Sequence, residues 1–329
     1  MRFSVVITTY NRLPLLKRAI DSALNQTVLC EVVVVDDCSS DGTEDYVQEL
    51  SQQLKQSGRG SLIYHRNETN QGHACSVNTG VQLAQGEWIK LIDDDDYLAP
   101  NCLEEMIRAI RLHPLAVICS CQSLQVDSEG KELSRTRQPG PGKVFYIPQS
   151  DVHYGMLLEQ VPFGTPVQVA FQREAFLKSG GWNSSLDTNC DDIDSWVKIA
   201  RFGDALFINH CLAYRTIWPG ACNYRFSIEQ RMEANFLVKQ QIYELIHADK
   251  RTISPSLSTV QNYLRLHWGL VALKQKQMGK ALQMFLPAFL SFAAWKLLLQ
   301  VHSRTHTPTI RRIVLSESDT PTPQVPVPS

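Results

Sequence analysis

The 329-residue sequence lacks a CxxC cysteine pair, a charge excess of either sign and the ~20-residue apolar run that a membrane-spanning helix needs. Its nine cysteines are scattered, the closest pair being Cys119 and Cys121, which argues against a disulfide framework or a zinc ribbon. We therefore expect reduced, buried thiols in a cytoplasmic protein. With 32 Lys and Arg against 33 Asp and Glu, the net charge of -1 argues against a protein that binds nucleic acid by neutralising phosphates. Met1 and Arg2 lead straight into an apolar run, so we expect no signal peptide.

The first ~120 residues alternate short apolar runs with amphipathic segments, which predicts a mostly parallel, three-layer α/β/α sheet. The runs expected to form buried strands cover residues 3–8, 31–36, 62–64, 88–92 and 115–121. The expected helices are residues 11–24, with Asn11 as the capping residue, residues 74–84, and a helix opened by Pro100 that runs to Leu112.

The second half of the chain is less regular, and we expect a mobile Pro- and Gly-rich loop over residues 135–148. A further strand is expected at 167–171 and helices at 191–202, 228–246 and 256–276, with another helix ending at Gly180 and Gly181. We divide the chain into a catalytic α/β domain at 1–225, a C-terminal helical extension at 226–302 and a disordered tail at 303–329. The tail beyond Ser316 is rich in Pro, Ser and Thr.

Carboxylates concentrate after two of the expected strands. Asp36 and Asp37 follow the second strand, and Asp93 to Asp96 follow the fourth. Because ligands of open parallel sheets bind beyond the carboxyl ends of the strands, both groups are expected at one crevice. Four consecutive carboxylates repel one another unless water screens them or a cation neutralises them, and hard oxygen ligands favour Mg²⁺ or Mn²⁺. The alternative is a solvated acidic turn before the next helix.

A third acidic group, Asp191, Asp192 and Asp194, lies where a helix is expected to begin. One of these carboxylates is a candidate general base. The alternative interpretation is that they only stabilise a helix N-terminus, where Asp is common.

Several short motifs together resemble family 2 glycosyltransferases of the GT-A fold. They are Val5-Val6-Ile7-Thr8-Thr9-Tyr10-Asn11-Arg12, the run from Val34 to Thr43, Asn70-Gln71-Gly72, Gly86 to Tyr97, and Gly180 to Asn183 with Asp191 to Trp196. The resemblance covers about residues 3–220. It implies an inverting enzyme that transfers a sugar from a nucleotide-diphosphate donor to an acceptor hydroxyl.

The resemblance also assigns roles to individual residues. Those implied to bind the nucleotide sugar are Thr8, Tyr10, Asp37, Asp93 and Asp94, with Asp37 accepting from the base. Asp95, together with Asp93, corresponds to the metal-binding DxD motif for Mg²⁺ or Mn²⁺, and Asp192 corresponds to the catalytic base.

The chain departs from the family's pattern at several positions. Asp191 replaces the usual Glu, Val77 stands where many relatives carry Arg, and the segment from Tyr214 to Gly220 lacks its His, which leaves a third metal ligand open. His73 and His210 are further candidates for phosphate or metal contacts. Trp182 could stack on a sugar or pack in the core.

The acceptor is expected to be a saccharide or a lipid-linked saccharide, in the assembly of a bacterial-type surface polysaccharide, glycolipid or glycoprotein. Residues 279–301 are apolar and flanked by Lys and Arg, which favours peripheral contact with the inner face of an anionic membrane. Packing on the catalytic domain or in a homodimer is the alternative.

Two other functions stay open at this point. One is a binding or scaffold protein that has lost activity. The other is a sugar-nucleotide pyrophosphorylase, which needs a Gly-rich loop after the first strand, whereas residues 8–14 contain no Gly.

Overall fold

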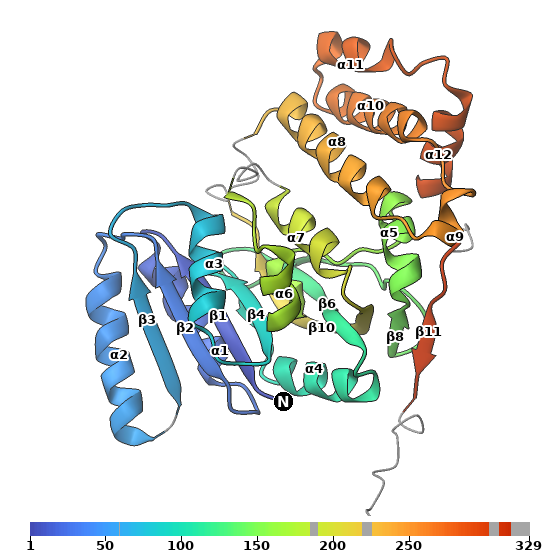
Figure 1. Cartoon of the computed structure of the whole chain (residues 1–329). Helices are drawn as coiled ribbons and strands as arrows, with labels where there is room; N and C mark the ends of the chain where they lie inside the picture. The colour runs from blue at the N-terminus through green and yellow to red at the C-terminus, as the bar shows by residue number, and fades with distance from the viewer. Residues whose placement is uncertain (59, 185–189, 219–225, 303–308, 317–329) are drawn as a thin grey trace, which may run out of the picture.

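The computed structural model describes residues 1–58, 60–184, 190–218, 226–302 and 309–316 (Figure 1). The strands of these residues form one mixed sheet in the order β11-β8-β10-β6-β9-β4-β1-β2-β3, while β5 pairs with β10 and β7 with β6. The strands are β1 (Phe3–Thr9), β2 (Glu31–Asp36), β3 (Ser61–Arg66), β4 (Trp88–Asp93), β5 (Tyr97–Leu98), β6 (Ala116–Val126), β7 (Glu132–Arg135), β8 (Val144–Ile147), β9 (Val169–Gln172), β10 (Asp204–Thr216) and β11 (Ile313–Leu315).

Helices connect these strands along the chain. They are α1 (Leu13–Leu24), α2 (Thr43–Ser57), α3 (His73–Leu83), α4 (Cys102–Leu112), α5 (Gln149–Leu157), α6 (Arg173–Ser179), α7 (Asp191–Ile199), α8 (Ile228–Glu244), α9 (Ala248–Arg251), α10 (Leu257–Lys274), α11 (Met278–Phe285) and α12 (Phe292–His302). A short 3₁₀ helix, η1 (Pro166–Gln168), leads into β9.

The N-terminal part of the sheet is parallel, because β1 pairs in parallel with β2 and β4, and β2 with β3. The β-branched runs of β1 and β2 are buried on both faces, as expected for strands covered by helices on each side. Helices α1, α2 and α4 pack on one face, and α3, α6 and α7 on the other (Figure 1). The predicted three-layer α/β class is thus confirmed, with β9 as an antiparallel strand between β4 and β6.

The N-terminus of α1 differs from the expectation. The helix begins at Leu13, and Asn11, predicted as its cap, has a positive φ of 53°. Asp41 serves the helix instead, since its Oδ2 accepts a hydrogen bond of 2.8 Å from the Leu13 amide. The Asn11 side chain accepts from the Ser40 amide at 2.8 Å, so the loops after β1 and β2 are tied together.

Lys90 joins the two halves of the sheet from inside the core. It lies on β4, is fully buried, and its ammonium donates to the carbonyls of Leu91, Pro166, Val167 and Val169 at 2.6–3.2 Å. Burial lowers the pKa of this ammonium. Because a buried amine needs such acceptors, Lys90 fixes η1 and the start of β9 against β4.

Five strands were not expected. Residues 144–147, assigned to the mobile loop, form β8, and β5, β7 and β10 were not anticipated. The tail predicted to be disordered from residue 303 contains β11, which pairs antiparallel with β8, so that prediction is wrong for residues 309–316. The rest of the tail and the proposed boundary at 225 lie outside the described residues.

The C-terminal helices stand above one end of the sheet (Figure 1). Ser227 caps α8 in a capping box with Gln230, and Ser256 caps α10. The apolar segment 279–301 forms parts of two helices, separated by a turn that contains Pro287. Of the helices in the described part of the chain, none is long and apolar enough to cross a membrane. Side chains of α8, α10 and α12 belong to the same hydrophobic cluster as α3, α6 and α7.

The cysteines agree in part with the expectation of buried thiols. All eight that the structure describes are free, and four of them are buried.

Candidate active site

The carboxyl ends of β1, β2 and β4 meet at one edge of the sheet. Thr8 on β1 lies beside Val35 on β2 and Asp93 on β4, and is itself buried. Tyr10, just past β1, is 47% exposed at the rim. The acidic residues that follow β2 and β4 therefore lie in one region, as the strand-end pattern predicted.

Asp37 is buried and organises the loop before α3. Its two oxygens accept hydrogen bonds from the Asn67 side chain and from the Gln71 and Gly72 amides, each at 2.8 Å. A carboxylate offers about four acceptor positions, so one further donor can still be accommodated. The preceding Asp36 is occupied by the Ser39 amide and the Tyr64 hydroxyl.

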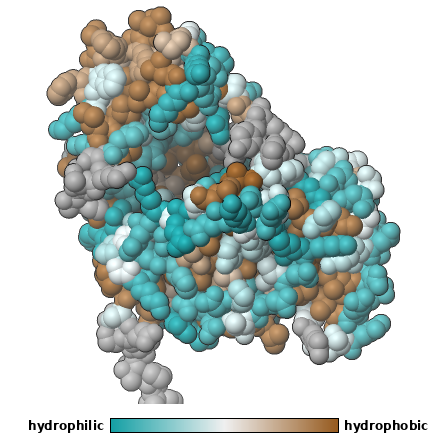
Figure 2. All heavy atoms as spheres, turned by 180° about the vertical axis from the view of Figure 1, so that it is seen from behind, coloured by the Kyte–Doolittle hydropathy of each residue, from teal (hydrophilic) through white to brown (hydrophobic). Residues whose placement is uncertain are grey.

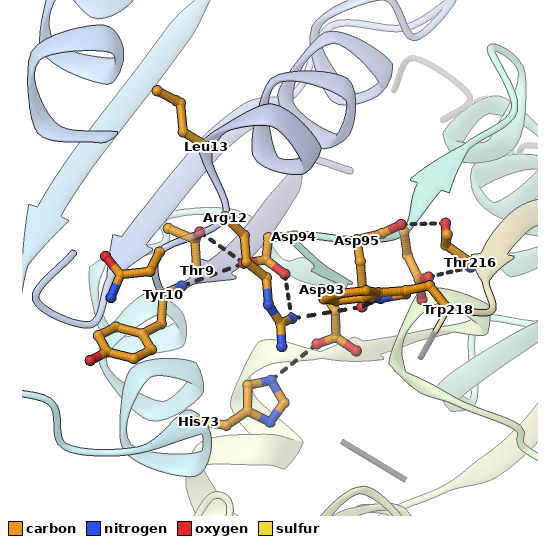
Figure 3. Close-up of polar contacts among 12 residues, drawn as sticks. Thr9, Tyr10, Arg12, Leu13, His73, Asp93, Asp94, Asp95, Thr216 and Trp218 are labelled. Atoms are coloured by element: carbon orange, nitrogen blue, oxygen red, sulfur yellow. Dashed lines mark hydrogen bonds and ion pairs between the residues drawn. The ribbon is translucent and has the colours of Figure 1, made fainter. Parts of the chain in front are cut away.

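Asp94 is used to hold the loop after β1 (Figure 3). The Thr9 hydroxyl donates to its Oδ2 at 2.8 Å, and Arg12 pairs with its Oδ1 at 2.9 Å. Burial raises the pKa of Asp94 to about 6, with Arg12 opposing the rise and the charge of Asp95 adding to it. Asp94 thus points toward β1 and away from the other carboxylates.

Asp93, Asp95 and Asp96 form the group that could hold a cation. Carboxylate oxygens of these three residues lie within 4.8 Å of one another. Burial and repulsion from Asp93 raise the pKa of Asp95, and burial with repulsion from Asp95 raises that of Asp96 well above its ordinary range. These carboxylates offer three hard oxygen ligands, and too few cationic side chains of the described residues lie beside them to balance their charge. Such a group is a suitable donor set for Mg²⁺ or Mn²⁺.

Residues from the end of β10 position this group. The Trp218 indole donates to Asp95 Oδ2 at 2.8 Å, and the Thr216 amide donates to Asp96 Oδ1 at 2.8 Å (Figure 3). The Thr216 hydroxyl also donates to the Asp95 carbonyl, to which Arg18 donates at 2.7 Å. The backbone of the acidic turn is therefore fixed on both sides.

His73 connects two acidic groups that are about 100 residues apart in the sequence. Its Nε2 lies 3.0 Å from Asp93 Oδ1, and its Nδ1 lies 3.6 Å from Asp191 Oδ2. Burial favours the neutral ring, but Asp191 and Asp93 outweigh it and hold the pKa of His73 well above its ordinary value. Burial likewise opposes ionisation of Asp93, but His73 keeps the pKa of Asp93 low. His73 thus lies between two carboxylates, which favour its protonated form.

Asp192 lies in the first turn of α7, next to Asp191. Its Oδ1 accepts a 2.7 Å hydrogen bond from the Ile193 amide. Burial raises the pKa of Asp192 to about 7, and the charges of Asp191 and Asp93 add to the rise. Asp194, the third member of the group, is buried and paired with Lys198 at 2.7 Å on the same helix. The N-terminus of α7 therefore faces the β4 carboxylates.

Other candidates have different surroundings. Trp182 is buried in edge contacts with His73 and Trp196, consistent with packing. His210 is exposed on β10, and Val77 is buried in the core of α3. From the sequence, no role is assigned to Arg12 or Trp218, and Asp96 belongs to the acidic run without being assigned to the metal, although all three lie within the motifs quoted above.

These features define an α/β enzyme fold with a strand-end acidic site, and comparison with known proteins identifies it. Residues 4–180 match the family model described as Glycosyl transferase family 2. The match spans more than half of the chain, so the protein belongs to this family.

One curated relative is an uncharacterised glycosyltransferase of Haemophilus influenzae. It is 30% identical over 200 residues, which cover 60% of this chain and 62% of the relative. The chain thus spans less than two thirds of that relative's length.

Solved structures share the GT-A fold. Staphylococcus aureus TarS 1–349 in complex with UDP-GlcNAc superimposes with a TM-score of 0.60 at 17% identity, covering 92% of this chain and 79% of that one. The mannosyltransferase PcManGT from Pyrobaculum calidifontis, in complex with GDP-Man and Mn²⁺, gives 0.56 at 20% identity, covering 90% and 78%. At these identities the likeness shows the fold, including C-terminal helices.

Proposed function

We propose that this protein transfers a sugar from a nucleotide-diphosphate donor to an acceptor hydroxyl, with inversion at the anomeric carbon. The observation that carries the proposal is the link through His73, which joins Asp93 of the acidic turn to Asp191, the neighbour of Asp192. A cation-binding group and a candidate base therefore share one site, as a single-displacement transfer requires. Family membership and structural neighbours that bind UDP-GlcNAc and GDP-Man support the same reaction.

In this reaction Asp192 is the catalytic base. It takes the proton of the acceptor hydroxyl while the oxygen forms a bond to the anomeric carbon from the face opposite the diphosphate. The bond between the anomeric carbon and the diphosphate oxygen breaks, and its electron pair leaves with the nucleoside diphosphate. A pKa of about 7 suits a base that works near neutral pH.

Asp93 and Asp95, together with Asp96, are proposed to hold Mg²⁺ or Mn²⁺. When bound, this ion supplies charge stabilisation to the leaving diphosphate. Trp218 and Thr216 keep the carboxylates in place for it. A single base is then sufficient, in contrast to a glycosidase, which uses two carboxyl groups.

The nucleotide is proposed to lie over the ends of β1 and β2. Tyr10 at the rim offers an aromatic face, buried Thr8 lines the floor, and Asp37 has acceptor capacity for one N–H of the base. Asp94 contributes by fixing the loop after β1 through Thr9 and Arg12.

A direct assay separates this function from the two alternatives. Purified protein is incubated with a panel of nucleotide sugars and Mn²⁺ or Mg²⁺, and release of nucleoside diphosphate and glycosyl transfer are measured. We expect cation-dependent release with at least one donor. A protein that binds nucleotide sugars but releases nothing would be the inactive scaffold, and one that forms sugar nucleotide from nucleoside triphosphate would be the pyrophosphorylase.

We propose that residues 1–225 bind the donor and catalyse transfer, and that residues 226–302 help to bind the acceptor. The acceptor is proposed to be a saccharide or a lipid-linked saccharide of a surface polysaccharide, glycolipid or glycoprotein. A cytoplasmic protein would meet a lipid-linked acceptor at the inner face of the membrane.

The turn between α11 and α12 is proposed to contact that membrane. Its neighbourhood exposes large apolar side chains, namely Met278, Leu282, Leu286, Phe289, Leu290, Phe292 and Leu299. Figure 2 shows the C-terminal helices as a largely apolar lobe. Lys274 and Lys276, just before α11, are exposed and form no ion pair with a described residue, which suits an anionic lipid surface.

Flotation with anionic and neutral vesicles tests this contact. We expect retention on anionic vesicles that falls with salt and is lost in Leu290→Gln, whereas Leu29→Gln, an equally exposed leucine on the α/β domain, stays bound. Retention that is the same for both variants and both vesicle types would refute membrane contact. Concentration-dependent dimerisation lost in Leu290→Gln would assign the surface to a homodimer instead.

A further inference from the structure

Two adjoining cavities separate the C-terminal helices from the α/β domain. The larger, of about 840 Å³, lies between β6, the segment 136–139, the end of α5 and α12. The smaller, of about 480 Å³, lies against α8 and α10, and the two share Arg137, Glu159 and Val301. We call the pair the C-terminal groove, and Figure 2 shows a hollow below the C-terminal lobe. Its size is that of pockets that enclose ligands larger than one sugar ring.

The lining of the groove mixes aliphatic, amide and aromatic side chains. Its aliphatic members include Leu158, Ile253, Leu264, Leu297 and Val301, and its amide side chains are Gln122, Gln138, Gln160, Gln168, Gln300 and Asn235. Its aromatic side chains are Tyr154, Tyr263, His267, Trp268 and His302. Amides both donate to and accept from hydroxyl groups, and aromatic rings cover the apolar faces of sugar rings. The amide and aromatic members of the lining are therefore suited to the hydroxyl groups and ring faces of a saccharide.

Three cations in the groove lack an anionic partner. Arg137, Lys296 and Arg312 line the larger cavity, and none of them forms an ion pair with a residue that the structure describes. Glu159 is the acidic member of the described lining, and it is paired with Lys239 at 2.6 Å. The groove therefore carries uncompensated positive charge.

Arg312 gives the clearest sign of a missing partner. Its Nη2 donates to the Gln160 carbonyl at 2.9 Å, while its Nε is buried and has no hydrogen-bond partner among the described atoms. A buried guanidinium N–H without an acceptor costs free energy that a bound carboxylate or phosphate oxygen would recover.

Two lining residues of the groove contact the segment that carries the proposed catalytic base. Asn235 of the smaller cavity points its Nδ2 toward Cys190 Sγ at 3.9 Å, and Cys190 immediately precedes Asp191 and Asp192. Gly164 of the larger cavity accepts a 3.2 Å hydrogen bond from the Trp196 indole on the same helix, α7. Both cavities thus border the helix whose first turn carries Asp192.

We propose that the C-terminal groove binds the acceptor, and that this acceptor is a saccharide carrying an anionic group, a carboxylate or a phosphate. The inference rests on the proposed transfer reaction, because it takes Asp192 as the point where the acceptor hydroxyl is deprotonated. Arg137, Lys296 and Arg312 bind the anionic group, and the amide and aromatic side chains bind the sugar rings between it and the reacting hydroxyl.

Binding measurements with defined probes test the proposal without requiring turnover. The probes are a fluorescent uronic-acid tetrasaccharide, the same tetrasaccharide with its carboxyl groups reduced to alcohols, and a hexose 1-phosphate with the free hexose as its neutral counterpart. The full-length chain is compared with Arg137→Gln and Lys296→Gln, whose side chains make no ion pair in the described structure. Lys143→Gln, an exposed charge change outside the lining, is the matched control.

We expect at least one anionic probe to bind about tenfold or more tightly than its neutral counterpart, because a charged hydrogen bond contributes at least that factor. Arg137→Gln and Lys296→Gln should each remove most of this preference, and Lys143→Gln should keep it. The probe that shows the preference tells whether the group is a carboxylate or a phosphate. Equal binding of anionic and neutral probes, or a preference that survives both groove variants, would overturn the proposal.

Release of nucleoside diphosphate from the donor is measured in parallel on the unmodified chain, with each probe present as the acceptor. Cation-dependent release without anionic selectivity would refute the groove alone. Anionic selectivity without any release would contradict the proposed transfer reaction and leave a saccharide-binding groove.

Discussion

Replacing Asp192 with Asn should abolish transfer and at the same time stabilise the protein. The Asn side chain is similar in size and can still accept from the Ile193 amide, but it can neither remove a proton nor carry a charge. General-base contributions of 10²–10⁴-fold are typical, so we expect the transfer rate to fall by about that factor. The gain in stability follows from the position of the carboxylate beside Asp191 and Asp93.

The size of the gain can be worked from the pKa. Burial raises the pKa of Asp192 from 3.8 to about 7, so the native state binds a proton that the unfolded chain releases above pH 3.8. Stability therefore falls as pH rises from about 4 to about 7, by up to roughly 4 kcal/mol at 1.36 kcal/mol per unit. Asn escapes this loss, so the variant and the wild type should differ little at pH 4 and most above pH 7.

Urea unfolding at several pH values, without divalent ions, measures this difference. Asp194→Asn is the matched control, because it removes a carboxylate from the same turn but breaks the ion pair with Lys198 and should destabilise. If Asp192→Asn were no more stable than the wild type at pH 8, Asp192 would not be a carboxylate held against unfavourable charges. Unchanged transfer would remove it from the role of base.

Three further predictions concern the rest of the site and the core. The pH profile of kcat/KM should rise through a midpoint no higher than about 7, the pKa of Asp192, and an acidic midpoint near 4 would contradict that assignment. Millimolar Mn²⁺ should raise the melting temperature of the wild type, measured by calorimetry, because the ion binds the native state. Asp95→Asn should lose this increase, and Asp45→Asn, an exposed control, should keep it. Lys90→Met should cost at least about 3 kcal/mol in urea unfolding, since buried carbonyls lose their donor, and a neutral effect would refute the role given to Lys90.

The parallel part of the fold was predictable because its strands are continuous apolar runs that need cover on both faces. β10 escaped prediction because Asn209 and His210 interrupt its apolar pattern, and the structure has a register shift between Ile208 and Cys211. β11 is three residues long and exists through its pairing with the edge strand β8, so no local signal could reveal it.

The position of the candidate site could be predicted from the sequence, but the role of each carboxylate in it could not. The position of Asp93 can be predicted because it ends a strand. Residues 94–96 lie in a turn, where side-chain directions do not alternate regularly and cannot be read from the sequence. Asp94 consequently turns to Arg12 and Asp96 to the Thr216 amide, and both depend on segments distant in the sequence. The bridging role of His73 was equally hidden, because it requires α3 and α7 to be placed side by side by the sheet.

The charge balance of the site argues for the enzyme over the inactive scaffold. Six carboxylates, Asp93 to Asp96 with Asp191 and Asp192, face this region, whereas Arg12 and His73 are the cations that contact them in the described structure. Burial, with repulsion from neighbouring carboxylates, raises the pKa values of Asp94, Asp95, Asp96 and Asp192, so their ionisation opposes folding. A protein that only needed the fold would gain stability by replacing Asp192, whose carboxylate accepts, among the described residues, only from the neighbouring Ile193 amide. A divalent ion bound with its donor would be attracted by the same carboxylates, so their mutual repulsion would be relieved and would add to the free energy of binding. Groups that destabilise the fold in this way are typical of sites where charge develops during a reaction.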